Sequence, residues 1–131
     1  GTGSSSGYTL AGVDGPFIEF KAGNTYRFDQ ADGSNSGHPL LFYYDPGKTT
    51  IFSTGVTTNG TPGNAGAYTQ IVVADTTPHI LYYQCSSHGY MGNRVGTNSK
   101  VLQDISFVDS TGTAQVFASN AFAIAQAVAL G

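Results

Sequence analysis

Hydrophobic and polar residues alternate along several short stretches of the chain. The stretch Thr25-Tyr26-Arg27-Phe28-Asp29 alternates strictly, which is the period-2 pattern of a half-buried strand. Denser apolar stretches bounded by turn-forming residues predict strands at 40–44, 68–73 and 80–85. We expect further strands at 8–10, 17–21, 101–108 and 114–117, with weaker strand character at 51–52 and 56.

Turn-forming residues separate these stretches at fairly regular spacing. Asp14-Gly15-Pro16, Asp45-Pro46-Gly47 and the Gly/Asn-rich segment 59–66 predict turns, and we expect a loop from Gly92 to Ser99. Tyr and Phe are abundant whereas Lys, Arg and Glu are scarce, a balance that favours strands over exposed helices. The chain is therefore predicted to be all-β, with about eight or nine short strands in a Greek-key β-sandwich or barrel.

The length of 131 residues predicts one domain whose core needs no disulfide. We expect a flexible tail at 1–7, the β domain at 8–118, and an apolar segment at 119–131 that packs on the domain or on a neighbouring subunit. In that last segment, large apolar residues recur at every second position, which favours a strand, while the intervening alanines favour a helix. Because the large residues recur at every second position, we favour a strand for this segment.

Charge and hydropathy exclude several kinds of partner. The formal net charge is −3 and the charges form no runs, so we expect neither a nucleic-acid groove nor a membrane-surface patch. No apolar run is long enough to span a bilayer, and no secretory leader pattern is present. Since the chain begins at Gly1, we expect a processed chain or part of a longer one. A single cysteine forms no internal disulfide, so cysteine content does not fix the compartment.

Three side chains suited to metal binding follow the predicted strand at 80–85. Cys85 and Met91 are the only cysteine and methionine of the chain, and His88 lies midway between them. Sulfur ligands combined with imidazole select copper, and two His, one Cys and a weak axial Met form the blue-copper arrangement. A second imidazole is available from His38, which precedes the strand predicted at 40–44. We therefore predict a copper site formed by His38, Cys85, His88 and Met91.

Other interpretations of these residues are weaker. A lone Cys-x-x-His is not specific, because a buried cysteine is usually a small hydrophobic residue. Zinc would have only one thiolate, and Met is a poor zinc ligand. A nucleophilic Cys–His pair would need an orienting group and an oxyanion site, for which there is no local motif. No further His cluster offers a second copper or an open substrate position, so we expect no enzyme.

Three more polar residues lie near the predicted site in the sequence. His79 begins the strand that ends at Cys85, so we expect an exposed turn residue and not a ligand. Asp29 and Asn35 precede His38 and either hold its second nitrogen and brace its loop or are ordinary turn residues.

The pattern Tyr83-x-Cys85-x-x-His88-x-x-Met91-x-Asn93, with His38 before an apolar strand, resembles the cupredoxin (type 1 copper) family. Its short loop is similar to the amicyanin-type variant, and the resemblance covers about residues 17 to 95. It implies imidazole ligation by His38 and His88, thiolate ligation by Cys85 and axial ligation by Met91. It also implies that His88 is the exposed edge through which electrons pass.

Two features depart from a small electron carrier of that family. The chain continues far past Met91, and the segment 53–66 is long and rich in Ser, Thr, Gly and Asn. With the stretches 26–40 and 55–63, these features resemble cupredoxin-like modules in virion structural proteins of marine and cyanobacterial tailed phages. That resemblance implies a location in the virion and contacts with other virion proteins or with copies of the same chain.

Two functions follow as expectations. The first is a structural or decoration module of a phage particle, in which one copper ion clamps the β-sandwich. The second is a small soluble carrier that cycles between Cu(I) and Cu(II), meets redox partner proteins, and works in the periplasm or outside the cell.

Overall fold

The computed structural model describes residues 2–4, 6–99, 105–108, 110–112 and 114–117. Over these residues the chain is nearly all β, and the one helical element is a short 3-10 turn at Gly33–Asn35 (η1). No helix in this part of the chain is long and apolar enough to cross a membrane. The chain divides into two compact units, residues 1–99 and 100–131, and each is described by itself. The all-β prediction is confirmed.

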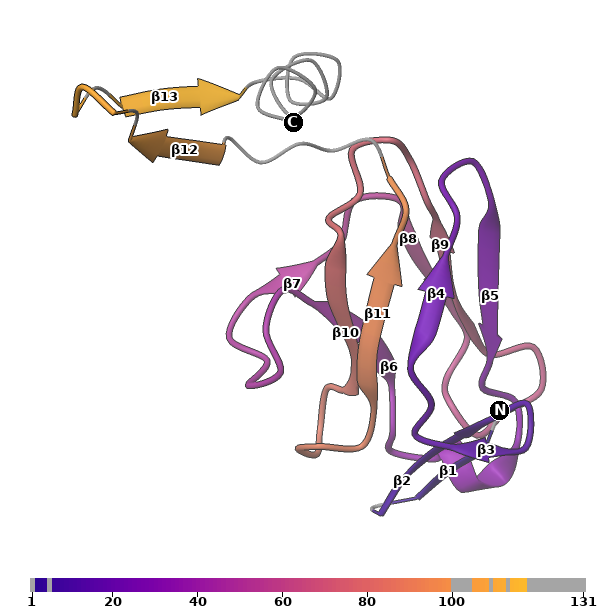
Figure 1. Cartoon of the computed structure of the whole chain (residues 1–131). Coiled ribbons are helices and arrows are strands. Elements are labelled where there is room, and N and C mark those ends of the chain that lie inside the picture. Colours follow the sequence, from indigo (N-terminus) through magenta and orange to yellow (C-terminus); the bar gives the residue numbers. More distant parts are fainter. Residues whose placement is uncertain (1, 5, 100–104, 109, 113, 118–131) are drawn as a thin grey trace. The chain divides into compact units, whose positions relative to one another are not determined.

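The first unit contains two main sheets that form a β-sandwich without closing into a barrel (Figure 1). The larger sheet has the order β4 (Ile18–Phe20), β11 (Asn93–Thr97), β10 (Ile80–Cys85), β6 (Leu40–Tyr43) and β7 (Ile51–Phe52). The smaller sheet has the order β5 (Thr25–Asp29), β9 (Tyr68–Val72) and β8 (Val56–Asn59). Neighbouring strands are antiparallel, apart from the parallel pair β4–β11.

Two smaller sheets complete the described elements. In the first unit, β1 (Thr2–Ser4), β2 (Gly7–Leu10) and β3 (Val13–Asp14) form an antiparallel sheet, so the segment expected to be a tail lies partly in strands. The second unit contains the antiparallel hairpin of β12 (Ile105–Val108) and β13 (Ala114–Phe117). Residues 119–131 lie outside the described residues, so their strand or helix character and the boundary at 118 stay predictions.

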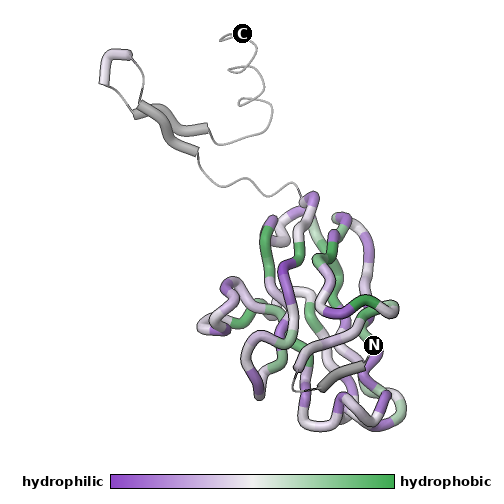
Figure 2. The backbone as a smooth tube through the Cα atoms, turned by 60° about the horizontal axis from the view of Figure 1, so that its bottom comes forward, coloured by the Kyte–Doolittle hydropathy of each residue, from purple (hydrophilic) through white to green (hydrophobic). Residues whose placement is uncertain are grey.

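Large side chains from both sheets meet in one core. In β10, Leu81, Tyr83 and Cys85 alternate into it and are fully buried, as the period-2 pattern predicts. Phe20, Phe42 and Ile71 reach the same core from β4, β6 and β9, and Figure 2 shows hydrophobic and hydrophilic positions interleaved along the tube of this unit. Cys85 therefore lies at the end of a strand that is paired with β11 and β6 on its two edges and packed in the core.

The prediction of a loop from 92 to 99 is wrong, because residues 93–97 form the strand β11. Its side chains carry too little apolar character to predict a strand: Arg94 is exposed, Gly96 has no side chain, and only Val95 is a large buried aliphatic residue. Hydrogen bonding to β10 on one side and β4 on the other makes it a strand. The short strand β3 and the turn η1 are likewise additional to the sequence prediction.

Candidate metal centre

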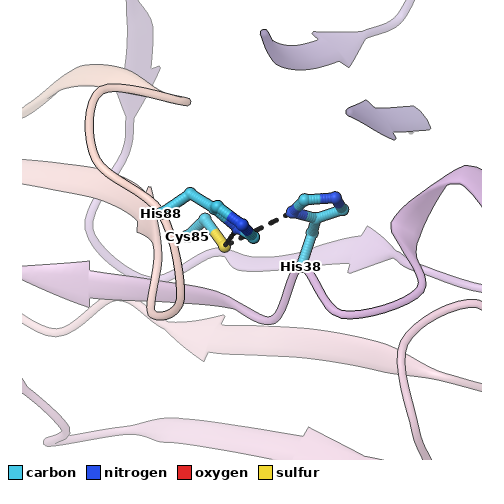
Figure 3. Close-up of side chains that lie close together, drawn as sticks. All are labelled: His38, Cys85 and His88. Carbon is cyan, nitrogen blue, oxygen red and sulfur yellow. Dashed lines mark hydrogen bonds between the residues drawn. The ribbon is translucent and has the colours of Figure 1, made fainter. Parts of the chain in front are cut away.

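Three predicted ligands converge at one end of the sandwich. The ligating atoms of His38, Cys85 and His88 all lie within 4.8 Å of one another. The Cys85 Sγ is 3.7 Å from the Nδ1 of His38 and 3.7 Å from the Nδ1 of His88. Figure 3 shows the two imidazoles pointing toward the sulfur from two separate segments of the chain. Residues 47 positions apart in the sequence thus share one centre.

Cys85 is the last residue of β10, and its strand position turns the sulfur into the core. The side chain is fully buried, and the main-chain N–H of Ser87 points at the sulfur, with a nitrogen–sulfur distance of 3.3 Å. The thiolate is the form of cysteine that ligates metals, and the Ser87 N–H is a hydrogen-bond donor placed at its sulfur. The chain then turns, so that His88 comes back to the same sulfur from the loop that follows.

His38 is held by its own main chain between η1 and β6. Its N–H donates to the carbonyl oxygen of Asn35 at 2.8 Å. Its carbonyl oxygen accepts two hydrogen bonds, from the Tyr8 hydroxyl at 2.8 Å and from the Gln30 side-chain amide at 2.8 Å. The N–H of Ser86 donates to the carbonyl oxygen of Pro39 at 3.0 Å, which joins the His38 segment directly to the ligand loop.

Gln30 and Thr69 extend this support into the core. Gln30 is buried, and its side-chain oxygen accepts from the N–H of Leu40 at 3.0 Å. The hydroxyl of Thr69, on the opposing sheet, donates to the carbonyl oxygen of Leu40 at 2.7 Å. The main chain from His38 to Leu40 is therefore tied to side chains whose polar groups are paired, an arrangement that fixes a buried polar network.

The loop that carries His88 is closely packed at its far end. An added Cβ at Gly92 would lie 1.7 Å from the carbonyl oxygen of Tyr83, so the chain passes against β10 where only glycine fits. Tyr90 has a φ of 60° and an exposed ring, while His88 is also exposed. The loop thus presents one imidazole to solvent and keeps the cysteine sulfur buried.

Met91, the fourth predicted ligand, is 1% exposed and belongs to the same core cluster as Cys85. Its carbonyl oxygen accepts a hydrogen bond from the N–H of Tyr8 at 2.8 Å, so the N-terminal sheet holds this end of the loop. The buried position agrees with an axial ligand, and the ligation itself stays a prediction.

Three buried or partly buried tyrosines of this unit have raised pKa values, and two of them, Tyr8 and Tyr43, are affected by the Cys85 sulfur. Burial, and then the Cys85 sulfur, raise the pKa of Tyr8 far above its usual range. The same two causes raise the pKa of Tyr43, and burial alone raises the pKa of Tyr83 to about 12. These tyrosines therefore stay uncharged at neutral pH, and Tyr8 and Tyr43 add no negative charge near the sulfur.

The two sulfur–nitrogen separations fit one bound ion. Metal–sulfur and metal–nitrogen bonds are about 2.3 and 2.1 Å long, so one ion reaches two such atoms when they lie less than about 4.4 Å apart. The two sulfur–nitrogen separations of 3.7 Å meet that condition. The cluster can hold a metal ion through one thiolate and two imidazoles.

The sequence identified the three clustered residues but not their supports. His79 is exposed and its Nε2 lies 3.0 Å from the carbonyl oxygen of Ser99, away from the cluster, as expected. Asn35 braces His38 through its main chain, whereas the Asp29 carboxylate accepts from the N–H of Ala31. Sequence reasoning missed the supports Tyr8 and Gln30, which reach His38 across 30 and 8 positions. It also missed Lys48, whose ammonium donates to the carbonyl oxygen of Cys85 across 37 positions. None of the three lies in a local motif.

In comparisons with known proteins, no family model, curated protein or solved structure matches the chain.

Proposed function

We propose that this chain is a cupredoxin-like copper protein in which His38, Cys85, His88 and Met91 hold one ion. The observation that carries the proposal is the His–Cys–His cluster, with both sulfur–nitrogen separations at 3.7 Å. When bound, copper would supply a strong link among these side chains and a one-electron couple. The residues themselves hold the thiolate in the core and one imidazole at the surface.

The donor set favours copper over other metals. A single thiolate and two imidazoles, with a buried thioether in the same core cluster, match the soft set of a type 1 site. A structural zinc site normally has four strong ligands, and Met is not among them. Carboxylates, which calcium and magnesium require, do not join this cluster among the described residues.

The primary role in this proposal is structural, as a module of a tailed-phage virion. The cluster joins the segment before β6 to the end of β10, and Tyr8 brings the N-terminal sheet to the same place. An ion that binds only the folded state stabilises that state, so copper would clamp these segments. The virion location rests on the sequence resemblance, and contacts with neighbouring subunits are part of the same proposal.

A small electron carrier is the second candidate, and the exposure of His88 favours it. A ligand imidazole at the surface gives a short path from the ion to a partner protein. The hydrogen bonds from Tyr8 and Gln30 to His38 also keep that ligand in place. The positions of the ligands would therefore change little when the charge on the ion changes.

Titration of the metal-free protein with Cu(II) tests the site. We expect an intense visible thiolate-to-copper band at one equivalent, lost in Cys85→Ser and strongly altered in His88→Ala. His79→Ala is the matched control, since it removes an exposed histidine outside the cluster, and it should leave the band unchanged. Met91→Leu should keep the fold and shift the band if Met91 is the axial ligand. A wild-type protein that stays colourless would refute the copper proposal.

Stability and association separate the two roles. For the structural role we expect copper to raise the unfolding midpoint markedly, and removal of residues 119–131 to reduce self-association in sedimentation experiments. A truncated protein that associates like the full chain would refute the subunit-joining part. For the carrier we expect fast, reversible electron exchange with little change in unfolding midpoint between the two oxidation states.

A further inference from the structure

Lys48 lies in a tight turn between β6 and β7 that belongs to neither ligand segment. The Asp45 carboxylate accepts from the N–H groups of Thr49 and Thr50 at 3.0 and 3.1 Å, and the N–H of Lys48 donates to the Asp45 carbonyl oxygen at 3.2 Å. Lys48 itself has a φ of 60°, which few residues with a side chain adopt. The turn is therefore fixed in a conformation that directs one long side chain away from its own strand pair.

The Lys48 ammonium reaches the ligand loop and binds its main chain. It donates to the carbonyl oxygen of Cys85 at 2.9 Å and to that of His88 at 2.8 Å, with the Ser86 carbonyl oxygen at 3.4 Å. An ammonium has three N–H donors, so these carbonyls can use all of them. Two of the accepting residues supply the clustered sulfur and imidazole.

One charged group thus joins the main chain of two candidate ligands. Hydrogen bonds from a charged donor are stronger than neutral ones, and they hold carbonyls that a loop would otherwise leave to water. Fixing both carbonyls to one point limits how far the Cys85 and His88 main chains can separate. The half-buried side chain also places a positive charge beside the loop.

We propose that Lys48 is a positioning residue of the metal centre: its ammonium sets the spacing of Cys85 and His88 and favours the less positively charged state of the bound ion. The second part rests on the proposed copper function, whereas the first concerns the metal-free chain. Cu(II) carries one more positive charge than Cu(I), so a fixed ammonium nearby disfavours Cu(II) and raises the reduction potential.

The first test measures amide hydrogen exchange in the metal-free protein. In Lys48→Met, a variant of similar length without the charge, we expect residues 86–89 to exchange about tenfold faster, as loss of hydrogen bonds to a charged group implies. Strand β9 should be unaffected. Lys21→Met is the matched control, because it removes an exposed lysine beyond β4, at the end of the sheet opposite the cluster. Unchanged exchange in the loop of Lys48→Met would overturn the positioning role.

The second test uses the copper-loaded protein. Lys48→Met should release copper faster and show a lower reduction potential than wild type, while Lys48→Arg, which keeps the charge, should restore most of the potential. An equal potential in wild type and Lys48→Met would overturn the electrostatic part. If Lys48→Met does not fold, Lys48→Gln replaces it in both tests. A wild-type protein that binds no copper refutes the proposed function, and the exchange test still decides the role of Lys48.

Discussion

The side-chain amide of Gln30 donates to the carbonyl oxygen of His38 at 2.8 Å, and its oxygen accepts from the N–H of Leu40 two residues later. Gln30→Leu would remove the acceptor of a buried N–H, so we expect a loss of about 1–3 kcal/mol in the free energy of unfolding. Urea denaturation measures the change. Gln70→Leu is the control, since the Gln70 side chain accepts from the exposed Arg27 guanidinium and its loss should cost less than about 0.5 kcal/mol. Equal losses in both variants would contradict this role.

Gly92 and Gly89 provide a matched pair within one loop. Alanine at Gly92 would place a Cβ 1.7 Å from the Tyr83 carbonyl oxygen, whereas alanine at Gly89 meets nothing within 4 Å. Because a backbone atom cannot give way as a side chain can, we expect Gly92→Ala to lose about 3 kcal/mol or more in thermal or urea unfolding. Gly89→Ala should stay within about 0.5 kcal/mol of wild type. A Gly92→Ala protein as stable as Gly89→Ala would show that the loop passes elsewhere.

The Tyr8 hydroxyl is one of two donors to the His38 carbonyl oxygen. Since Gln30 still pairs that oxygen in Tyr8→Phe, we expect a loss of only about 0.5–1.5 kcal/mol in the free energy of unfolding. The variant should also broaden the His38 imidazole signals in NMR spectra, because its main chain has lost one restraint. Tyr90→Phe removes an exposed hydroxyl from the ligand loop and serves as the control. Identical His38 signals in wild type and Tyr8→Phe would speak against the restraint.

The Asp45 turn should respond to acid. Hydrogen bonds, chiefly from the main chain of Thr49, hold the pKa of the Asp45 carboxyl below its usual 3.8. A lowered pKa means that the turn is stabilised above 3.8 and loses that contribution as the pH falls through the lower folded-state value. The Thr49 and Thr50 amide shifts should therefore move with a midpoint below 3.8 in an NMR titration. In Asp45→Asn the same shifts should stay flat, and a wild-type midpoint at or above 3.8 would contradict the prediction.

The period-2 pattern predicted most strands because it reports which face of a strand is buried. The stretch Thr25–Asp29 matches β5 throughout, and 80–85 matches β10. Strand β11 escaped prediction because its neighbours on both sides, not its own residues, make it a strand. Such pairing depends on the whole fold, so the residue types of the strand alone do not predict it.

The clustered residues could be predicted because metal chemistry restricts ligand types. A unique cysteine and a histidine three positions on are visible in the sequence, and His38 follows from the need for a second imidazole. Lys48 is different, since it lies 37 positions before Cys85 in a turn with no link to metals. Only the fold brings its ammonium to the loop.

The hydrogen bond from the Tyr8 N–H to the Met91 carbonyl oxygen bears on the order of folding and metal binding. Supports of the cluster come from residue 8 at one end and from β11, which closes the ligand loop, at the other. A growing chain that has just produced His88 has three of the four predicted ligands but not the strand that returns the loop to the sheet. Contacts between residues so distant in sequence slow folding, because the chain between them must be closed into a loop before they are gained. If the proposed metal binds, it would therefore bind the folded unit, so that folding would come before loading.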